Sequence, residues 1–240
     1  MHALHRFIRR ALPVPRTPAA TVMLEFAVGE LAQVDVGCGL VITDRQSGNV
    51  FKTWFFMMTM ACSRHQYAEL GRDQSVATWL ACHRHAFEWF NGVPSKVRID
   101  NPKCAITKAC YCEPTVQRAY GELAFGYEFI IDPCPVADRA KKGRVEAGVK
   151  YVKVNFAPLR DFHSLTQANE QLRAWVLGEA GNRIHGSTRE RPLNRFEGTE
   201  QDYYRRCRLS RQRTLPGPRP SCIRIAMSST TIATTGRRFV

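Results

Sequence analysis

The stretch Ala32-Gln33-Val34-Asp35-Val36-Gly37 alternates apolar and polar residues and continues into Leu40-Val41-Ile42. Alternation with a period of two is typical of a β-strand that buries one face. Residues 50–61 are mostly β-branched, aromatic or otherwise apolar, which predicts a second strand, buried on both faces. Because Asp35 is an acidic residue within the first strand, it is the first candidate for chemistry at the sheet.

The rest of the chain changes between strand-like and helix-like patterns. Residues 74–90 carry apolar side chains at a helical period and stop at Asn91-Gly92, where a helix is expected to end. The order is three strands, a helix, a strand, a helix, a strand and then helices, which predicts an α/β fold with helices covering a mixed sheet. The elements expected after the first two strands are a strand over 66–70, a helix over 74–90, a strand over 96–101, a helix over 115–124, a strand over 127–131, and helices over 143–156 and 165–179.

Length and composition favour one domain with tails. With 240 residues, 44% of them hydrophobic, the chain is long enough to bury its own core. We expect a basic, proline-rich linker over residues 1–25, because proline fixes the backbone and removes a hydrogen-bond donor. A core domain is expected over residues 26–200, followed by an irregular tail over 201–240.

Charge and cysteine usage narrow the class of protein. The formal net charge of +14 favours an anionic partner, either a nucleic acid or an anionic membrane surface, and a basic protein without such a partner is the alternative. The nine cysteines include no C-x-x-C pair, which predicts reduced thiols in a cytosolic compartment and no zinc site. The sequence has no run of 18 apolar residues, so no membrane-spanning helix is expected.

Three acidic residues lie where an α/β sheet tends to bind ligands. Asp35 is in the first strand, Asp100 at the end of the strand over 96–101, and Glu146 in the first turn of the helix over 143–156. Strand ends and a helix start can converge on one edge of such a sheet. Carboxylate oxygens are the ligands that Mg²⁺ prefers, and a pair of divalent ions supports phosphodiester chemistry. The alternative is that all three are ordinary surface acids.

Four blocks of sequence carry a family resemblance. The blocks are Gly29 to Gly37, Gly92-Val93-Pro94 leading to Ile99-Asp100-Asn101-Pro102-Lys103, Lys142-Gly143-Arg144-Val145-Glu146, and Arg183-Ile184-His185-Gly186 with Thr188 and Arg191-Pro192. In this order they resemble the integrase core of insertion-sequence transposases, most of all the IstA type, over about residues 5–200. The chain departs from the family at Val36, where an aromatic residue is usual, and over residues 138–140.

The resemblance implies a ribonuclease H-like fold and a DDE polynucleotidyl transferase, that is, a transposase that cleaves DNA strands and joins them to a target. It implies that Asp35, Asp100 and Glu146 are the catalytic residues and hold two Mg²⁺ (or Mn²⁺) ions. The implied partners are DNA, as element ends and target, and an AAA+ ATPase helper of the IstB type. In the full-length form a homo-oligomer is expected, acting in the bacterial cytoplasm at the nucleoid and not at a membrane.

Basic residues gain a role from the same resemblance. They would bind DNA phosphates without reading bases, whereas a solvated helix face is the alternative for those near Glu146. His185 could contact a scissile phosphate or cap a helix end, and the structural role is favoured. His83 and His85 are two residues apart in a predicted helix, so they do not share a face and are not expected to bind a metal together. The candidates for DNA binding are Lys141, Lys142, Arg144, Lys150, Lys153, Arg183 and His185.

The two ends of the chain differ from the family pattern. Residues 1–25 contain nothing that fits the N-terminal helix-turn-helix region of such transposases. After Asp202 the periodicity is lost, and reading residues 222–235 one base earlier can give a string similar to the family's small β-domain. We therefore expect a frameshift near residue 203 and a truncated, non-autonomous transposase. The alternatives are a catalytically silent DNA-binding or regulatory remnant of a transposase and a general nuclease of the same fold.

Overall fold

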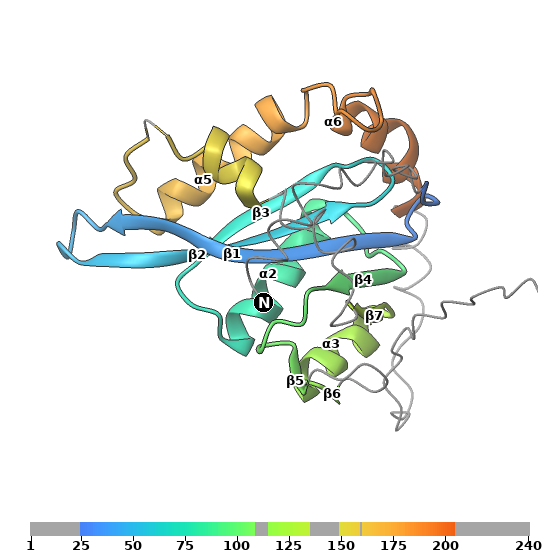
Figure 1. The fold of residues 1–240 in the computed structure, drawn as a ribbon, viewed down its shortest axis with the longest axis horizontal. Coiled ribbons are helices and arrows are strands. Elements are labelled where there is room, and N and C mark those ends of the chain that lie inside the picture. Colours follow the sequence, from blue (N-terminus) through green and yellow to red (C-terminus); the bar gives the residue numbers. More distant parts are fainter. Residues whose placement is uncertain (1–24, 109–114, 135–148, 159, 205–240) are drawn as a thin grey trace, which may run out of the picture.

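The computed structural model describes residues 25–108, 115–134, 149–158 and 160–204, and its centre is a five-stranded sheet (Figure 1). The strand order is β3-β2-β1-β4-β7. The pairs β1–β2 and β2–β3 are antiparallel, whereas β1–β4 and β4–β7 are parallel, so the predicted mixed sheet is confirmed. The strands are β1 (Leu31–Thr43), β2 (Val50–Met60), β3 (Gln66–Gly71), β4 (Lys96–Ile99) and β7 (Ile130–Pro133).

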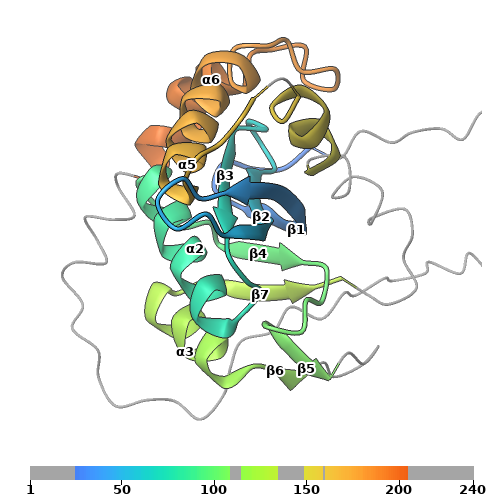
Figure 2. The same cartoon turned by 90° about the vertical axis from the view of Figure 1, so that its left-hand side faces the viewer.

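Helices cover both faces of the sheet and make three layers (Figure 2). One face carries α2 and α3, and the other carries α5 and a helix over residues 149–155. This is the ribonuclease H-like arrangement that the resemblance implied. The elements outside the sheet are α2 (Val76–Trp89), α3 (Arg118–Tyr127), α5 (Leu165–Trp175), the π-helical turn η1 (Val176–Ala180), α6 (Pro192–Arg195) and a second π-helical turn, η2 (Phe196–Glu200).

Each face of the sheet has its own core. Phe56 and Met58 of β2 belong to the core beneath α2 and α3, while Phe55 and Met57 belong to the core beneath α5. This part of β2 is therefore buried on both faces, as predicted. The other end of the strand differs from the prediction, since Val50 is 65% exposed where the β1–β2 hairpin projects beyond the rest of the sheet (Figure 1).

The helix predicted over residues 115–124 starts too early. Its first two residues form a short strand, β6 (Thr115–Val116), which pairs with β5 (Ile106–Lys108). The helix α3 begins only at Arg118, because the side-chain oxygen of Gln117 accepts a backbone N–H from its first turn (2.9 Å) and caps it. Strands this short leave no alternation that a sequence pattern could reveal.

α3 also ends later than predicted, which shifts the next strand. Glu128 has a left-handed backbone (φ 58°), and its N–H donates to carbonyl oxygens of the last helical turn. This arrangement ends the helix. β7 therefore begins at Ile130, and the prediction of a strand starting at Tyr127 is wrong.

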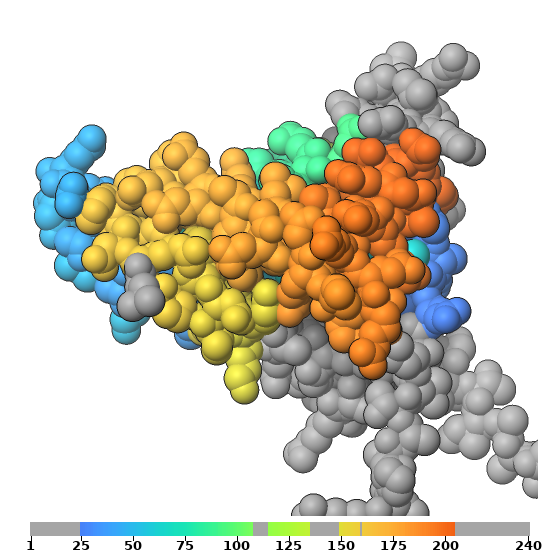
Figure 3. Space-filling view, turned by 90° about the horizontal axis from the view of Figure 1, so that it is seen from above, coloured from blue at the N-terminus to red at the C-terminus, as the bar shows by residue number. Residues whose placement is uncertain are grey.

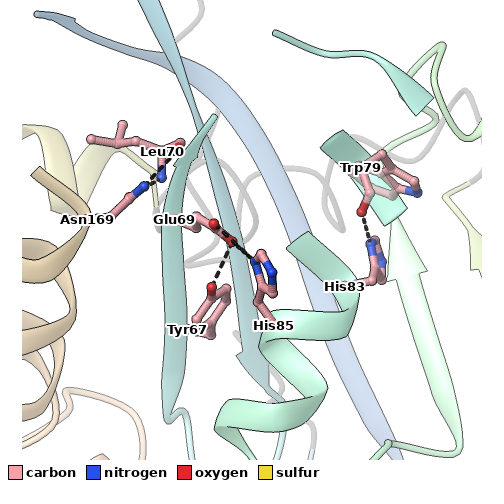
Figure 4. Close-up of polar contacts among 7 residues, drawn as sticks. All are labelled: Tyr67, Glu69, Leu70, Trp79, His83, His85 and Asn169. Carbon is pink, nitrogen blue, oxygen red and sulfur yellow. Dashed lines mark hydrogen bonds and ion pairs between the residues drawn. The ribbon is translucent and has the colours of Figure 1, made fainter. Parts of the chain in front are cut away.

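The edge strand β3 is closed by a side chain of α5 (Figure 4). The amide oxygen of Asn169 accepts a hydrogen bond from the N–H of Leu70 (2.7 Å), and its amide nitrogen donates to the carbonyl oxygen of Leu70 (3.0 Å). An edge strand otherwise exposes such backbone groups to water or to another chain. The two bonds therefore protect the edge and hold α5 against the sheet.

His83 and His85 have separate environments, as their spacing in α2 predicts (Figure 4). His83 is completely buried, and its Nδ1 lies 2.9 Å from the carbonyl oxygen of Trp79. Because a carbonyl oxygen only accepts, Nδ1 carries the proton and Nε2 accepts from the Tyr120 hydroxyl at 3.2 Å. His85 instead faces Glu69 of β3, with Nδ1 3.0 Å from Oε2.

His83 should make the fold less stable in mild acid. Burial lowers its pKa to about 4, below the ordinary value of 6.5 expected in the unfolded chain. The unfolded state therefore takes up the proton first, so this contribution to stability is fully present above pH 6.5 and is lost as pH falls towards 4. We expect a loss of about 1.4 kcal/mol per pH unit for each such proton, measured as the free energy of urea unfolding across this range.

In the double variant His83→Phe/Tyr120→Phe, the free energy of unfolding should fall less steeply with decreasing pH than in the wild type. The variant removes the titrating ring together with the hydroxyl that would lose its acceptor. Part of the slope should remain, since burial also lowers the pKa of His65 to about 4. Tyr120→Phe alone is the matched control and should keep the wild-type slope, because His83 stays buried. Equal slopes in the wild type and the double variant would contradict this account.

Candidate active site

Asp35 lies on β1, and Asp100 directly follows β4, which ends at Ile99 and not at residue 101 as predicted. β1 and β4 pair in parallel through Val34 and Ile99, and the two aspartates are the residues that follow these partners. Equivalent positions of a parallel pair point to the same face, with the strands about 4.8 Å apart. Val34 belongs to the core beneath α2 and α3, so strand alternation directs Asp35 towards the opposite face. The side chains of Asp35 and Asp100 are both partly buried.

The helix over residues 149–155 covers the face that carries Asp35. Asp35 pairs with Met57 of β2, whose side chain belongs to the core beneath α5. Two residues further along β1, and on the same face, a Cβ placed on Gly37 would lie 2.7 Å from Cγ1 of Val149. The glycine therefore lets this helix approach β1 closely beside Asp35.

The third predicted carboxylate, Glu146, lies outside the described residues, together with Lys141, Lys142 and Arg144. In the sequence Glu146 precedes Val149 by three residues, the spacing at which two residues of a helix share a face. Within the described part of the chain, no three His, Cys, Asp or Glu side chains are grouped as metal ligands. Asp35 and Asp100 thus each follow one residue of the last β1–β4 pair, and the three-acid metal site stays a prediction.

Asn101 fixes the backbone directly after Asp100. Its φ of 42° is left-handed, a conformation that asparagine tolerates better than most residues. The side-chain Nδ2 donates to the carbonyl oxygen of Cys134 (2.7 Å), and the N–H of Cys134 donates to the carbonyl oxygen of Ile99 (2.9 Å). These bonds tie the ends of β4 and β7 together beside Asp100. The sequence showed Asn101 only as part of a matching block, and its role at the strand end was not predicted.

The two described lysine candidates lie on the helix that covers Asp35. Lys150 is exposed and Lys153 is partly buried, and residues three apart are neighbours on a helix surface. Val149 and Val152 belong to the core beneath α5, so they fix which side of the helix is turned inwards. The lysines therefore lie at the outer surface of the layer that covers Asp35.

Arg183 contacts the same helix, and His185 lies in the turn that follows. The guanidinium carbon of Arg183 is 3.6 Å from the centre of the Tyr151 ring, a cation–π contact. Within the turn, the carbonyl oxygen of His185 accepts from the N–H of Arg189 (2.8 Å), and its Nδ1 accepts from the N–H of Ser187 (3.3 Å). His185 therefore caps a turn, which is close to the structural role favoured from the sequence, although the turn is not a helix end.

Comparisons with known proteins place the chain among its relatives. No model of a known protein family matches it. Over 201 residues it is 32% identical to Rv3428c of Mycobacterium tuberculosis, which is named as a transposase, and the match covers 83% of this chain and 47% of that protein. It is 29% identical over 185 residues to the transposase of an IS21-like insertion sequence element from Bacteroides fragilis, covering 75% of this chain and 35% of that protein. The chain is a relative of the IS21-type transposases.

Among solved structures, this transposase relative is similar to a chain of the simian T-cell lymphotropic virus intasome in complex with the PP2A regulatory subunit B56 gamma. The TM-score is 0.51 at 12% identity, and the match covers 83% of this chain and 61% of that chain. At this identity the likeness shows the fold alone.

The chain spans half or less of the length of the two transposases named above. Of the helices that the structure describes, none is long and apolar enough to cross a membrane.

Gly37→Ala should destabilise the fold by forcing the helix over residues 149–155 away from β1. The new methyl group would overlap Val149, and overpacking of this kind costs about 1–3 kcal/mol. Val149→Ala in the same chain should recover part of the loss, because it removes the overlapping methyl groups. Urea unfolding of both single variants and the double variant measures this coupling.

Gly178→Ala is the matched control, since a Cβ at Gly178 would meet no atom within 4 Å. It should leave the free energy of unfolding unchanged or raise it slightly, because alanine favours helix more than glycine does. Strictly additive losses for Gly37→Ala and Val149→Ala would show that the close approach of helix and strand does not exist.

Proposed function

We propose that the chain is the catalytic core of a DDE-type transposase, which cleaves DNA strands and joins them to a target in a metal-dependent reaction. The observation that supports this most is the β1–β4 register, because Asp35 and Asp100 each follow one residue of its last pair, Val34 and Ile99. Glu146 is proposed as the third acid, because it precedes the helix that packs on Gly37. The relatives named as transposases support the same kind of activity.

The residues suit a pair of hard divalent cations. Asp35 and Asp100 offer carboxylate oxygens, which such cations prefer, and both follow the last paired residues of β1 and β4. Two Mg²⁺ or Mn²⁺ ions held by these aspartates and Glu146 would lower the pKa of the attacking hydroxyl group and neutralise charge on the phosphate. The contribution of the chain is to keep the acids in place: the sheet holds Asp35, and the bonds of Asn101 hold the end of β4 at Asp100.

The basic residues are proposed to hold the DNA. Lys150 and Lys153 extend from the helix beside Asp35, and Lys141, Lys142 and Arg144 precede it in the sequence. Contacts of this kind bind phosphates and set the position of a duplex without reading its bases. We propose DNA as the substrate, an IstB-type ATPase as helper, and assembly with further copies of the chain.

Asp35→Asn, Asp100→Asn and Glu146→Gln should each abolish Mg²⁺- or Mn²⁺-dependent nicking and strand transfer. Each change replaces a charged metal ligand by a neutral amide of the same shape, so the loss should exceed the roughly 10–100-fold expected for residues that only support a ligand. The measurement is cleavage and joining of end-labelled duplex DNA, together with Mn²⁺ titration by calorimetry.

Glu122→Gln is the matched control, because Glu122 is an exposed carboxylate of α3 that pairs with Arg118. It should act like the wild type, and circular dichroism should show that all four variants are folded. Undiminished nicking in Asp35→Asn and Glu146→Gln would refute the proposed site. DNA binding by a wild-type chain that neither cleaves DNA nor binds metal would select a catalytically silent remnant instead.

A further inference from the structure

The β2–β3 turn meets α6 and η2, which are far from it in sequence, at the end of the sheet opposite the tip of the β1–β2 hairpin (Figure 1). The turn between β2 and β3 contains Cys62 and His65, and both contact the C-terminal segment. Arg195 Nη2 lies 3.9 Å from Cys62 Sγ, and the His65 ring packs on the Phe196 ring with their centres 4.9 Å apart. Arg64 lies between these two contacts. Arg195 also pairs with Glu190 at 3.4 Å, on the turn that carries His185, so Arg64 is held near that turn.

Arg183 is oriented, and one of its donors is unused. Its guanidinium lies over the Tyr151 ring, while its Nε–H is buried and has no hydrogen-bond partner among the described residues. The hydroxyl oxygen of Thr188, on the following turn, is also buried without such a partner. Buried donors in folded proteins are nearly always paired, so these groups indicate an acceptor supplied by something other than the described residues.

The surroundings of His185 are positively charged. Burial, and then the charges of Arg183 and Arg64, lower the pKa of His185 below its ordinary value. Glu190, an acid on the same turn, does not offset them, because its carboxylate pairs with Arg195 at 3.4 Å. All three basic side chains are only partly buried.

We propose that Arg64, Arg183 and His185 form a pocket for one phosphate group of the DNA backbone. This rests on the proposed function and extends it, since nothing in the sequence pointed to Arg64. A phosphodiester offers an anionic charge and several acceptor oxygens, which match the planar guanidinium donors and the imidazole. Figure 3 shows the segments from the helix over residues 149–155 to η2 as one continuous outer face, along which a DNA backbone can run.

The pocket also fixes where the DNA lies relative to the carboxylates. Arg183 stacks on Tyr151, and Tyr151 belongs to the helix that packs on Gly37 beside Asp35. A phosphate bound by Arg183 is therefore held at a fixed position relative to Asp35. Such a contact carries no sequence information and should act on all duplexes alike.

The test measures binding of fluorescently labelled duplex DNA by anisotropy over a range of salt concentrations, with EDTA present so that metal binding plays no part. Arg183→Gln and Arg64→Asn should each raise the Kd about 3–10-fold and reduce the slope of log Kd against log salt by up to about 0.9, the value for one phosphate. Asparagine is chosen because Arg64 has a φ of 66°, which asparagine tolerates. In the double variant Arg64→Asn/Arg183→Gln, the slope of log Kd against log salt should fall by no more than the value for one phosphate.

Arg118→Gln is the matched control, because it removes the same charge from an exposed position on α3 (86% exposed). Its Kd and slope should equal those of the wild type, and Arg64→Lys, which keeps the charge, should retain most of the affinity. If the wild type binds DNA and both pocket variants bind with unchanged Kd and slope, the pocket is refuted while the proposed function stands.

A second probe separates the pocket from DNA binding as a whole. Inorganic phosphate, compared with chloride at equal ionic strength, should raise the Tm of the wild type and not that of Arg64→Asn or Arg183→Gln. That result without any DNA binding would support the pocket and count against the proposed function. No effect of phosphate on the wild type, together with no DNA binding, would overturn both.

Discussion

The parallel pairing of β1 with β4 is the constraint on which the candidate site depends. Ala32 and Val34 of β1, with Val97 and Ile99 of β4, lie in the core beneath α2 and α3, and they fix the register of the two strands. A slip by one residue would turn these side chains outwards and bury a carboxylate in their place. Since burial of such a side chain stabilises by about 1.5–3 kcal/mol, apolar packing decides where Asp35 and Asp100 lie.

The opposite face of the sheet is held by a second set of contacts. Val149, from the helix beside Asp35, and Phe156, directly after it, share a core with Trp175 of α5, so the helix and α5 form one layer. Asn169 binds this layer to the edge strand, and the missing side chain of Gly37 lets it lie close to β1. The elements around Asp35 are therefore held in position by packing, and the charged side chains extend from these elements.

Much of this arrangement could be predicted from the sequence because its signals are local. Alternation across residues 32–37 and the apolar run of β2 identify strands whose neighbours are close along the chain, and the strand end at Asp100 is marked by Pro102. The β5–β6 pair could not be predicted, because strands of three and two residues carry no period. The Gln117 cap was missed because glutamine is not a usual capping residue.

The contacts around Arg64 could not be predicted for a different reason. Cys62 and His65 meet Arg195 and Phe196 only in the folded chain, and periodicity in a single sequence reports neighbours a few residues away. An arginine in a turn between two strands looks like any exposed basic residue. Its environment is visible only when the turn and the C-terminal segment are seen together.

The C-terminal segment belongs to the same folded unit as the sheet. Tyr204 is completely buried, its hydroxyl donates to Met60 Sδ (3.3 Å), and a Cβ on Gly92 would lie only 2.3 Å from the tyrosine Cβ. Glu200 is buried beside Ser63, and burial raises its pKa although backbone N–H groups of Gly29 and Ser63 bind it. The C-terminal segment therefore packs against the β2–β3 turn and the end of β2. Arg64 and the two aspartates consequently depend on different long-range contacts, so substitutions can alter the proposed DNA binding and the proposed metal-dependent cleavage separately.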